Sequence, residues 1–138
     1  MQLQSSLYSI FSNMIMSDEA TFIRDGLPLG ISESIEYMKA HYTEGITVQD
    51  VAAHAALHRA YFSKIFNEHI GIPPKQYLEK LKMEKALELL RLTAYTISEI
   101  SHSLGYSDPY TFTHAFSRYF GIPPGKWRKE RVSTILSE

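Results

Sequence analysis

Gly71-Ile72-Pro73-Pro74 occurs twice in this chain of 138 residues, returning as Gly121-Ile122-Pro123-Pro124. The second copy begins 50 residues after the first, and the aromatic residues before each copy repeat at the same offset: Phe62 and Phe66, then Phe112 and Phe116. A repeat of this period marks one supersecondary unit used twice, and it fixes the architecture before any single motif does. The chain is therefore expected to carry two related helical units.

Each copy of the repeat is typical of a place where one helix ends and another begins. A glycine in the left-handed conformation stops a helix. Prolines behind it prevent continuation, but they suit the first turn of the next helix. The first copy predicts a helix over about 58–70 and a long helix over about 74–92. The second predicts a helix over about 108–120 and a last helix from Pro123–Pro124.

A short helix with the same start signal precedes each of these units. Thr47 is followed by Asp50, and Thr96 by Glu99, the spacing of a capping box. A short helix, a tight turn and a second helix with one apolar face make a helix-turn-helix, so each pair predicts this motif. The turn in the second pair is one residue longer, and Asp108-Pro109 supplies an N-cap and a first helical residue there.

The first part of the chain is less regular. Apolar residues at helical spacing predict an amphipathic helix over 3–15, and residues 17–31 read as a linker. Ser32 is expected to cap a helix that runs to about His41, and Gly45 to end the region. We therefore divide the chain into an N-terminal helix and linker (1–30), a double helix-turn-helix domain (31–131) and a C-terminal tail (132–138).

Composition excludes several classes of protein. No run of about eighteen apolar residues predicts a membrane span. There is no secretory signal pattern, and there are no cysteines for disulfides, thiol catalysis or cysteine-ligated zinc. His54 and His58 straddle a predicted turn without a third ligand, and His69 is expected on a core-facing stripe. We expect a cytoplasmic protein, not an enzyme, with no metal, no cofactor and no membrane partner.

Charge is unevenly distributed although the net charge is only −1. Residues 1–45 hold two basic and six acidic groups, and residues 46–138 hold twelve basic and nine acidic groups. The C-terminal two-thirds is the part that can meet a polyanion. In a helix-turn-helix the second helix presents its outward face to the major groove of DNA. These outward faces hold Arg59, Ala60, Ser63, Lys64 and Asn67 in one unit, and Tyr110, Thr113, His114 and Ser117 in the other.

At this point the residues resemble a known family. The segment Ile97…Ile100…Leu104-Gly105-Tyr106-Ser107-Asp108…Phe112…Phe116…Gly121…Pro124…Trp127-Arg128 is similar to the signature of AraC/XylS-type transcription regulators, and Val51-Ala52…Leu57…Tyr61-Phe62-Ser63…Phe66…Gly71 matches its first unit. The resemblance covers about 32–131. It implies an all-α, seven-helix domain with two helix-turn-helix subdomains joined by a long linker helix, here with an extra N-terminal helix.

Carried over position by position, the resemblance implies base reading by Ala60, Ser63 and Lys64, and by Tyr110, Thr113 and His114. Arg59 is an additional contact or a phosphate ligand. The chain departs from the family pattern at His58, Ser101, Thr111 and His114; the first of these stands where a Ser or Thr cap is usual. His114 stands where Arg is common and lacks its bidentate fork, so the first unit is expected to contribute more specificity.

Phosphate contacts are expected at the helix N-termini and the rim of the same surface. The candidates are Thr47, Thr96, Asn67, Ser117, Arg118, Lys126 and Arg128, with Lys129 beside them. The alternative for each is a solvated surface residue, and for Arg128 an internal ion pair with an acid.

Together these features predict a sequence-specific regulator of transcription that inserts two recognition helices into successive major grooves of double-stranded DNA. The resemblance implies an activator that recruits RNA polymerase. It also suggests that residues 1–30 are the end of an effector-binding and dimerisation region, so the chain is interpreted as part of a larger regulator, with a stand-alone regulator as the alternative. A homodimer would then form through the N-terminal helix or that missing domain. A helical protein-interaction module that has lost DNA binding is the alternative function.

Overall fold

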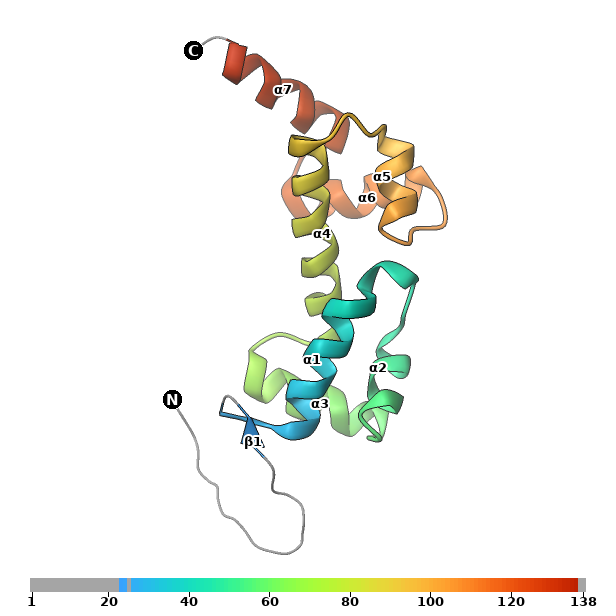
Figure 1. Ribbon diagram of the computed structural model, residues 1–138, viewed down its shortest axis with the longest axis vertical. Coiled ribbons are helices and arrows are strands. Elements are labelled where there is room, and N and C mark those ends of the chain that lie inside the picture. The colour runs from blue at the N-terminus through green and yellow to red at the C-terminus, as the bar shows by residue number, and fades with distance from the viewer. Residues whose placement is uncertain (1–22, 25, 137–138) are drawn as a thin grey trace, which may run out of the picture. The chain divides into compact units, whose positions relative to one another are not determined.

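The computed structural model describes residues 23–24 and 26–136, with side chains described as far as Arg131. Figure 1 shows a chain built from helices, in the order α1 to α7 with one short 3-10 turn, η2. The only strands in this part of the chain are β1 (Ile23–Arg24) and β2 (Leu27–Pro28), an antiparallel ribbon that pairs Ile23 with Pro28 and Arg24 with Leu27. The all-α prediction is thus confirmed. The helix predicted over 3–15 lies outside the described residues.

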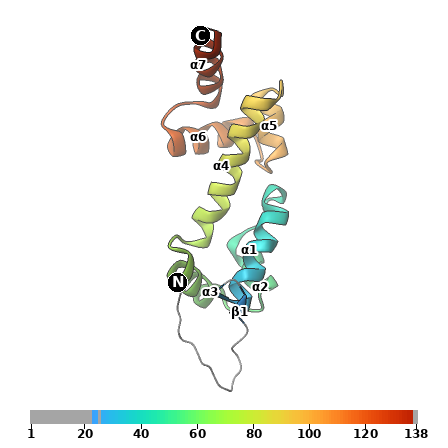
Figure 2. The same ribbon diagram turned by 60° about the vertical axis from the view of Figure 1, so that its left-hand side comes forward.

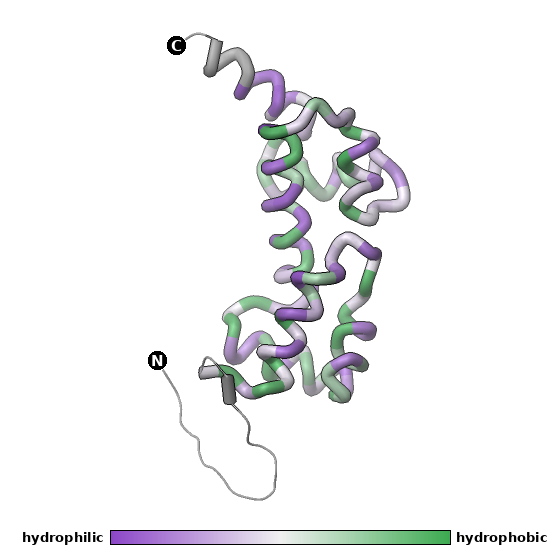
Figure 3. The backbone as a smooth tube through the Cα atoms, viewed as in Figure 1, coloured by the Kyte–Doolittle hydropathy of each residue, from purple (hydrophilic) through white to green (hydrophobic). Residues whose placement is uncertain are grey.

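The chain is divided into two compact units. Within the described residues, the first consists of 23–40 and 47–76, and the second of 41–46 and the residues from 77 onward. Each contains one of the two predicted helix-turn-helix pairs. Helix α4 (Pro74–Leu92) runs from the end of the first unit into the second without an intervening loop. Hydrophobic and hydrophilic residues alternate along it in Figure 3, the pattern of a helix with one buried face.

The first unit contains α1 (Leu29–His41), α2 (Val48–His54) and α3 (Arg59–Ile70). Helix α1 begins three residues before the predicted cap, so Ser32 lies buried in its first turn and does not cap it. A glycine early in a helix costs only about 1 kcal/mol. The complete burial of Ile31 is consistent with packing overriding that cost at Gly30. The predicted linker over 17–31 is therefore wrong in its last residues, which form β2 and the start of α1.

Helix α3 packs against α2 through its aromatic residues. Phe62 and Phe66 are completely buried, with ring centroids 5.5 Å apart. The next residue on this stripe is the half-buried Ile70, and His69 is exposed. The prediction of a partly buried His69 is wrong, because the i, i+4, i+8 path of the apolar stripe passes through Ile70.

The second unit contains η2 (Tyr42–Glu44), α5 (Ile97–Ser103), α6 (Pro109–Phe120), α7 (Pro124–Leu136) and most of α4. Helices α5 and α6 lie side by side in both ribbon views (Figures 1 and 2). Their core is one cluster of buried residues: Met83, Ala86, Leu90, Ile100, Leu104, Phe112, Ala115 and Phe116. Helix α7 continues to Leu136, so residues 132–136 are helical.

The repeated Gly-Ile-Pro-Pro acts as predicted in both units. Gly71 and Gly121 have φ angles of 95° and 88°, and their N–H groups donate to Asn67 and Ser117 carbonyls at 2.9 and 2.8 Å. Pro74 and Pro124 are the first residues of α4 and α7. The glycine therefore closes each second helix, and the proline begins the next one.

The two turns differ by one residue, as predicted. Residues 55–58 join α2 to α3, and residues 104–108 join α5 to α6. The shorter turn holds Ala56 at a φ of 58°, and the longer one holds Gly105 at 85°. Ser101, where the family pattern has Ala, is buried, and its hydroxyl donates to the Asp108 carbonyl at 3.0 Å across the longer turn. This hydrogen bond satisfies a hydroxyl that burial would otherwise leave without a partner.

Candidate nucleic-acid interface

Helix α3 presents four of its predicted contact residues, Ala60, Ser63, Lys64 and Asn67, on the side away from its buried phenylalanines, and Arg59 is its first residue. Arg59, Ala60, Lys64 and Asn67 are exposed and Ser63 is half-buried. The Lys64 amine lies 3.9 Å from the Glu68 carboxylate, and both side chains are largely exposed. Exposed pairs of this kind contribute about 0–1 kcal/mol, so the amine is available to another anion.

Helix α6 presents a second outward face with a different chemistry. Tyr110 and His114 are exposed, and Thr113 and Ser117 are half-buried, whereas Phe112 and Phe116 are buried on the opposite side. The rings of Tyr110 and His114 meet edge to face, with centroids 4.5 Å apart and planes at 72°. The structure thus brings the predicted residues of each unit together on one helix face.

The N-termini of these two helices carry opposite charge. His58 begins α3 without a side-chain capping hydrogen bond, and Arg59 follows it. Asp108 caps α6 by accepting from the Thr111 N–H at 2.8 Å and from the Thr111 hydroxyl at 3.1 Å. The Thr111 N–H bond is the largest of the effects that lower the pKa of Asp108, so the carboxylate is ionised at neutral pH. A phosphate therefore meets attraction at the start of α3 and repulsion at the start of α6.

Thr47 and Thr96 are capping residues. Both capping boxes are complete: each threonine oxygen accepts from the N–H three residues on, and each threonine N–H donates to the Asp50 or Glu99 carboxylate at 2.8 Å. These bonds use two of the N–H donors at each helix start, and they place a carboxylate beside that start. The local geometry therefore favours helix capping over the predicted phosphate contact at these two residues.

Arg128 lies inside the second unit, half-buried against the C-terminal end of α4. Its guanidinium donates to the carbonyl oxygens of Leu90 at 3.1 Å, Tyr95 at 2.6 Å, Leu89 at 3.4 Å and Thr93 at 3.3 Å. Neither the phosphate role nor the alternative ion pair with an acid fits this arrangement. The side chain instead satisfies carbonyl groups that the end of a helix leaves without partners.

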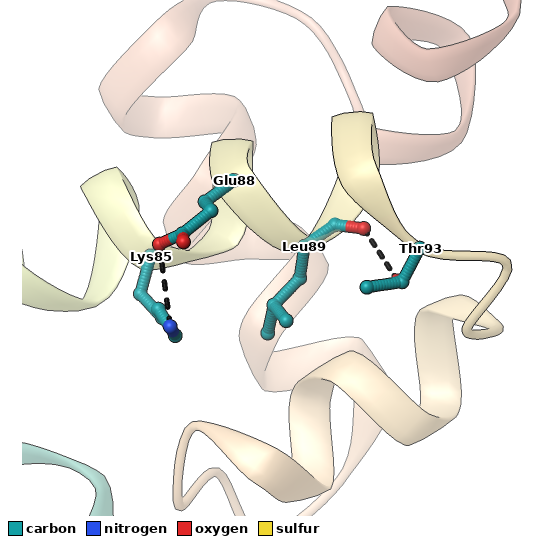
Figure 4. Close-up of polar contacts among 4 residues, drawn as sticks. All are labelled: Lys85, Glu88, Leu89 and Thr93. Carbon is teal, nitrogen blue, oxygen red and sulfur yellow. Dashed lines mark hydrogen bonds and ion pairs between the residues drawn. The ribbon is translucent and has the colours of Figure 1, made fainter.

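The same helix end is closed by a threonine (Figure 4). The Thr93 hydroxyl donates to the Leu89 carbonyl at 2.6 Å. The Tyr95 N–H donates to the Thr93 hydroxyl at 3.2 Å. One turn earlier, Lys85 pairs with Glu88 at 3.2 Å. The connection from α4 to α5 is therefore held by the side chain of Thr93, just beyond the end of α4, and by the side chain of Arg128 from α7.

The remaining predicted rim residues are exposed and only weakly paired. Arg118 lies 3.5 Å from Glu79, and Lys126 lies 4.0 Å from Glu130. Both basic side chains are more than half exposed. Pairs this exposed contribute little to stability, and both cations remain accessible to a polyanion.

Sequence reasoning missed two features of this surface. Tyr61 is 54% exposed in the first turn of α3; an aromatic residue outside the Phe62–Phe66 stripe is the signal that could have found it. The second feature is the amine of Lys82, 4.8 Å from the centre of the Tyr106 ring. Burial lowers the pKa of Lys82, and mainly burial raises the pKa of Tyr106 to about 12. This cation–π contact between Lys82 and Tyr106 joins the turn before α6 to α4. No local sequence pattern predicts it.

Comparison with known proteins gives a consistent result. The model of a family described as a helix-turn-helix domain matches residues 51–130. The lactose operon transcription activator of Staphylococcus xylosus is 35% identical over 98 residues, which are 71% of this chain and 35% of that protein. The raffinose operon transcriptional regulatory protein RafR of Pediococcus pentosaceus is 30% identical over 129 residues, 92% of this chain and 47% of RafR. The chain thus spans about a third to a half of these relatives.

Solved structures agree with the fold. The DNA-binding domain of the global transcriptional factor AdpA, solved in complex with a target DNA, matches with a TM-score of 0.72 and 25% identity over 76% of this chain and 95% of that domain. The C-terminal domain of AraT, a response regulator from Geobacillus stearothermophilus, matches with a TM-score of 0.71 and 29% identity over 74% of this chain and 85% of that domain.

Proposed function

The chain belongs to the AraC/XylS-type family of helix-turn-helix transcription regulators, and from this premise we propose that it binds double-stranded DNA sequence-specifically and activates transcription. The observation that carries the proposal is the repeated geometry of α3 and α6. Each is the second helix of a helix-turn-helix, with phenylalanines buried on one side and polar or aromatic residues exposed on the other. A face of this kind fits the major groove, where base edges differ in hydrogen-bonding pattern.

In this proposal, α3 and α6 enter successive major grooves. Base edges are read by Ala60, Ser63 and Lys64 in one groove, and by Tyr110, Thr113 and His114 in the other. The phosphate contacts come from Arg59, Asn67, Ser117, Arg118 and Lys126. Arg128 leaves this set because its guanidinium is bound to carbonyl groups within the protein. Thr47 and Thr96 also leave this set, because their side chains cap α2 and α5.

The two units are proposed to bind with unequal strength. Lys64 and Arg59 give α3 two cations near the bases, whereas the corresponding part of α6 has the Asp108 carboxylate and a histidine. Lysine can donate to the acceptors on a guanine edge. The first unit is therefore expected to contribute most of the affinity and more of the sequence preference.

A random-pool selection of bound duplexes, followed by anisotropy titration, tests the proposal. Because bound cations release phosphate counterions, the logarithm of the affinity should fall linearly and steeply with the logarithm of salt between about 50 and about 200 mM. A weak and flat response with every duplex would contradict DNA binding and favour the protein-interaction module.

Lys64→Ala tests the reading role directly. We expect a loss of about 1–3 kcal/mol in binding and a relaxed preference at one base pair. Lys39→Ala, which removes another exposed cation, from α1, is the matched control and should change binding little. Uniform weakening across all sequences would show that Lys64 contacts only phosphate.

Further parts of the proposal concern the partners of the whole protein. RNA polymerase is the proposed protein partner, because an activator acts by recruiting it, and the cytoplasm is the proposed location. Among the described residues, no helix is long and apolar enough to cross a membrane. A homodimer is proposed to form through the predicted helix over 3–15 or a domain outside this chain. Sedimentation of the chain with and without residues 1–22 tests the first route, since a dimer that persists without them would exclude it.

A further inference from the structure

Tyr110 is the most exposed large hydrophobic side chain of the described residues, at 66%. It is the second residue of α6, after Pro109 at the first helical position and the Asp108 cap. The proline fixes the local backbone, and the cap fixes the start of the helix. Tyr110 therefore has a defined position at the N-terminal end of α6, although it does not belong to the core.

His114 constrains the orientation of the Tyr110 ring. The two residues are four apart on the helix, so their side chains are neighbours on one face. Their rings pack edge to face at 4.5 Å, an arrangement that aromatic rings prefer. The pair presents the faces of two aromatic rings at the N-terminal end of the recognition helix.

The other residues on the outward face of α6 limit which group on DNA the Tyr110–His114 pair can recognise. Its other members are Thr113 and Ser117, so the face lacks the Arg, Lys, Asn or Gln side chains that read guanine or adenine with two hydrogen bonds. Arg118 lies one residue beyond the face and pairs with Glu79. The Asp108 carboxylate beside Tyr110 disfavours a phosphate there. An apolar group on a base edge is the ligand that fits this surface, and thymine alone presents one in the major groove.

We infer that Tyr110 contacts the C5 methyl group of a thymine in the half-site of the second unit, and that His114 is a positioning residue that holds the Tyr110 ring for this contact. The inference rests on the proposed function, because it assigns a ligand to the same surface. It gives the second unit a specificity of its own, based on apolar contact and not on charge.

Deoxyuridine substitution provides the test, because replacing thymine with deoxyuridine removes only this methyl group. In the duplex selected from the random pool, each thymine is replaced in turn and the dissociation constant is measured. One thymine of the second half-site should lose about fourfold in affinity, the effect of exposing one buried methyl. Tyr110→Ala should bind the thymine and deoxyuridine duplexes equally, whereas Tyr110→Phe should keep the ratio.

His114 is tested by the same ratio. His114→Ala should reduce the thymine-to-deoxyuridine ratio, and His114→Phe, which keeps an aromatic ring at this place, should restore it. An unchanged ratio in His114→Ala would overturn its positioning role. Lys64→Ala is the control for the other unit: it should lower the affinity for both duplexes and leave the ratio unchanged. Thermal unfolding of each variant shows that the fold is retained.

The outcomes separate this inference from the proposed function. If the wild-type chain binds the selected duplex in a salt-dependent way, but no thymine shows the effect or the effect persists in Tyr110→Ala, the inference is overturned and the proposed function stands. If the wild-type chain binds no duplex in a salt-dependent way, the proposed function fails, and the inference fails with it.

Discussion

The guanidinium of Arg128 illustrates how one residue can determine the structure around it. It contacts four carbonyl oxygens between Leu89 and Tyr95, and thus ties α7 to the end of α4. Hydrogen bonds from a charged donor contribute more than neutral ones, and the planar guanidinium serves several acceptors at once. Removing it leaves partly buried carbonyl groups without a donor.

We therefore expect Arg128→Ala to lower the free energy of unfolding by about 2–3 kcal/mol. Arg128→Lys should recover less than half of this loss, because an ammonium group lacks the planar fork. Urea denaturation measures both changes, with Lys129→Ala, an exposed neighbour, as the control at about 0.5 kcal/mol or less. Full recovery in Arg128→Lys would show that charge alone explains the role.

The pKa of Asp108 predicts how acid affects α6. Hydrogen bonds from Thr111 favour the charged carboxylate and lower this pKa in the folded state. A depressed folded pKa adds stability above the unfolded value of about 3.9, and this stability is lost as pH falls through the folded value. Asp108→Asn keeps the cap but cannot titrate.

Urea midpoints measured from pH 7 down to acid should show the wild-type chain losing stability relative to Asp108→Asn below about pH 4. A Glu130→Gln chain serves as the control, because it removes another exposed carboxylate far from the α6 cap in sequence. A constant difference between wild type and Asp108→Asn at every pH would contradict the proposed stabilisation of the charged form.

At the scale of single residues, the sequence predicted which side chains face outward better than it predicted which groups they hydrogen-bond. The spacing of Phe62 and Phe66 fixed which side of α3 faces outward, and Ala60, Ser63 and Lys64 lie there as expected. Arg128 was placed wrongly because its acceptors are backbone carbonyls, which every residue has and no side-chain pattern reveals. The interface roles of the outward residues stay predictions.

At the scale of elements, helix boundaries followed the strong local signals. The capping boxes at Thr47 and Thr96 gave the starts of α2 and α5, and the left-handed glycines gave the ends of α3 and α6. The start of α1 was missed because no such signal stands there, and burial of Ile31 outweighs the weak helix propensity of Gly30.

Gly105 is the residue on which the longer turn depends. A Cβ there would collide with the Thr43 carbonyl oxygen and lie 3.1 Å from the Gly45 nitrogen, and the φ of Gly105 is 85°. Side chains tolerate neither the conformation nor the contact with backbone atoms. The close approach of this turn to η2 therefore requires glycine.

Gly105→Ala should lower the free energy of unfolding by about 3 kcal/mol, from both strained φ and overpacking. Gly121→Ala is the matched control: its φ is 88°, but a Cβ there would have nothing within 4 Å. It should cost only about 1 kcal/mol. Urea denaturation of the two variants separates backbone strain from collision, and equal losses would rule out the collision with η2.

At the scale of the whole molecule, the repeat predicted more than composition did. A net charge of −1 gives no sign of a DNA-binding protein, whereas the 50-residue period predicted two helix-turn-helix units and the helix that joins them. The net charge did not indicate DNA binding, because binding depends on where the charges lie on the surface. The net charge is a sum over the chain and does not contain those positions. The arrangement of the two units on DNA is a long-range property that no local pattern specifies.

That arrangement leads to a prediction about operator geometry. Because the proposed function places α3 and α6 in successive major grooves of one duplex, we expect the two half-sites at one spacing, about one helical turn of DNA. Inserting about five base pairs between the half-sites rotates one to the opposite face of the duplex. The affinity should then fall at least about tenfold, to that of a duplex with only the first half-site intact. An equal insertion outside the half-sites is the control and should have no effect. Undiminished affinity after the internal insertion, combined with a loss when the second half-site is scrambled, would mean that the two units bind as independent modules.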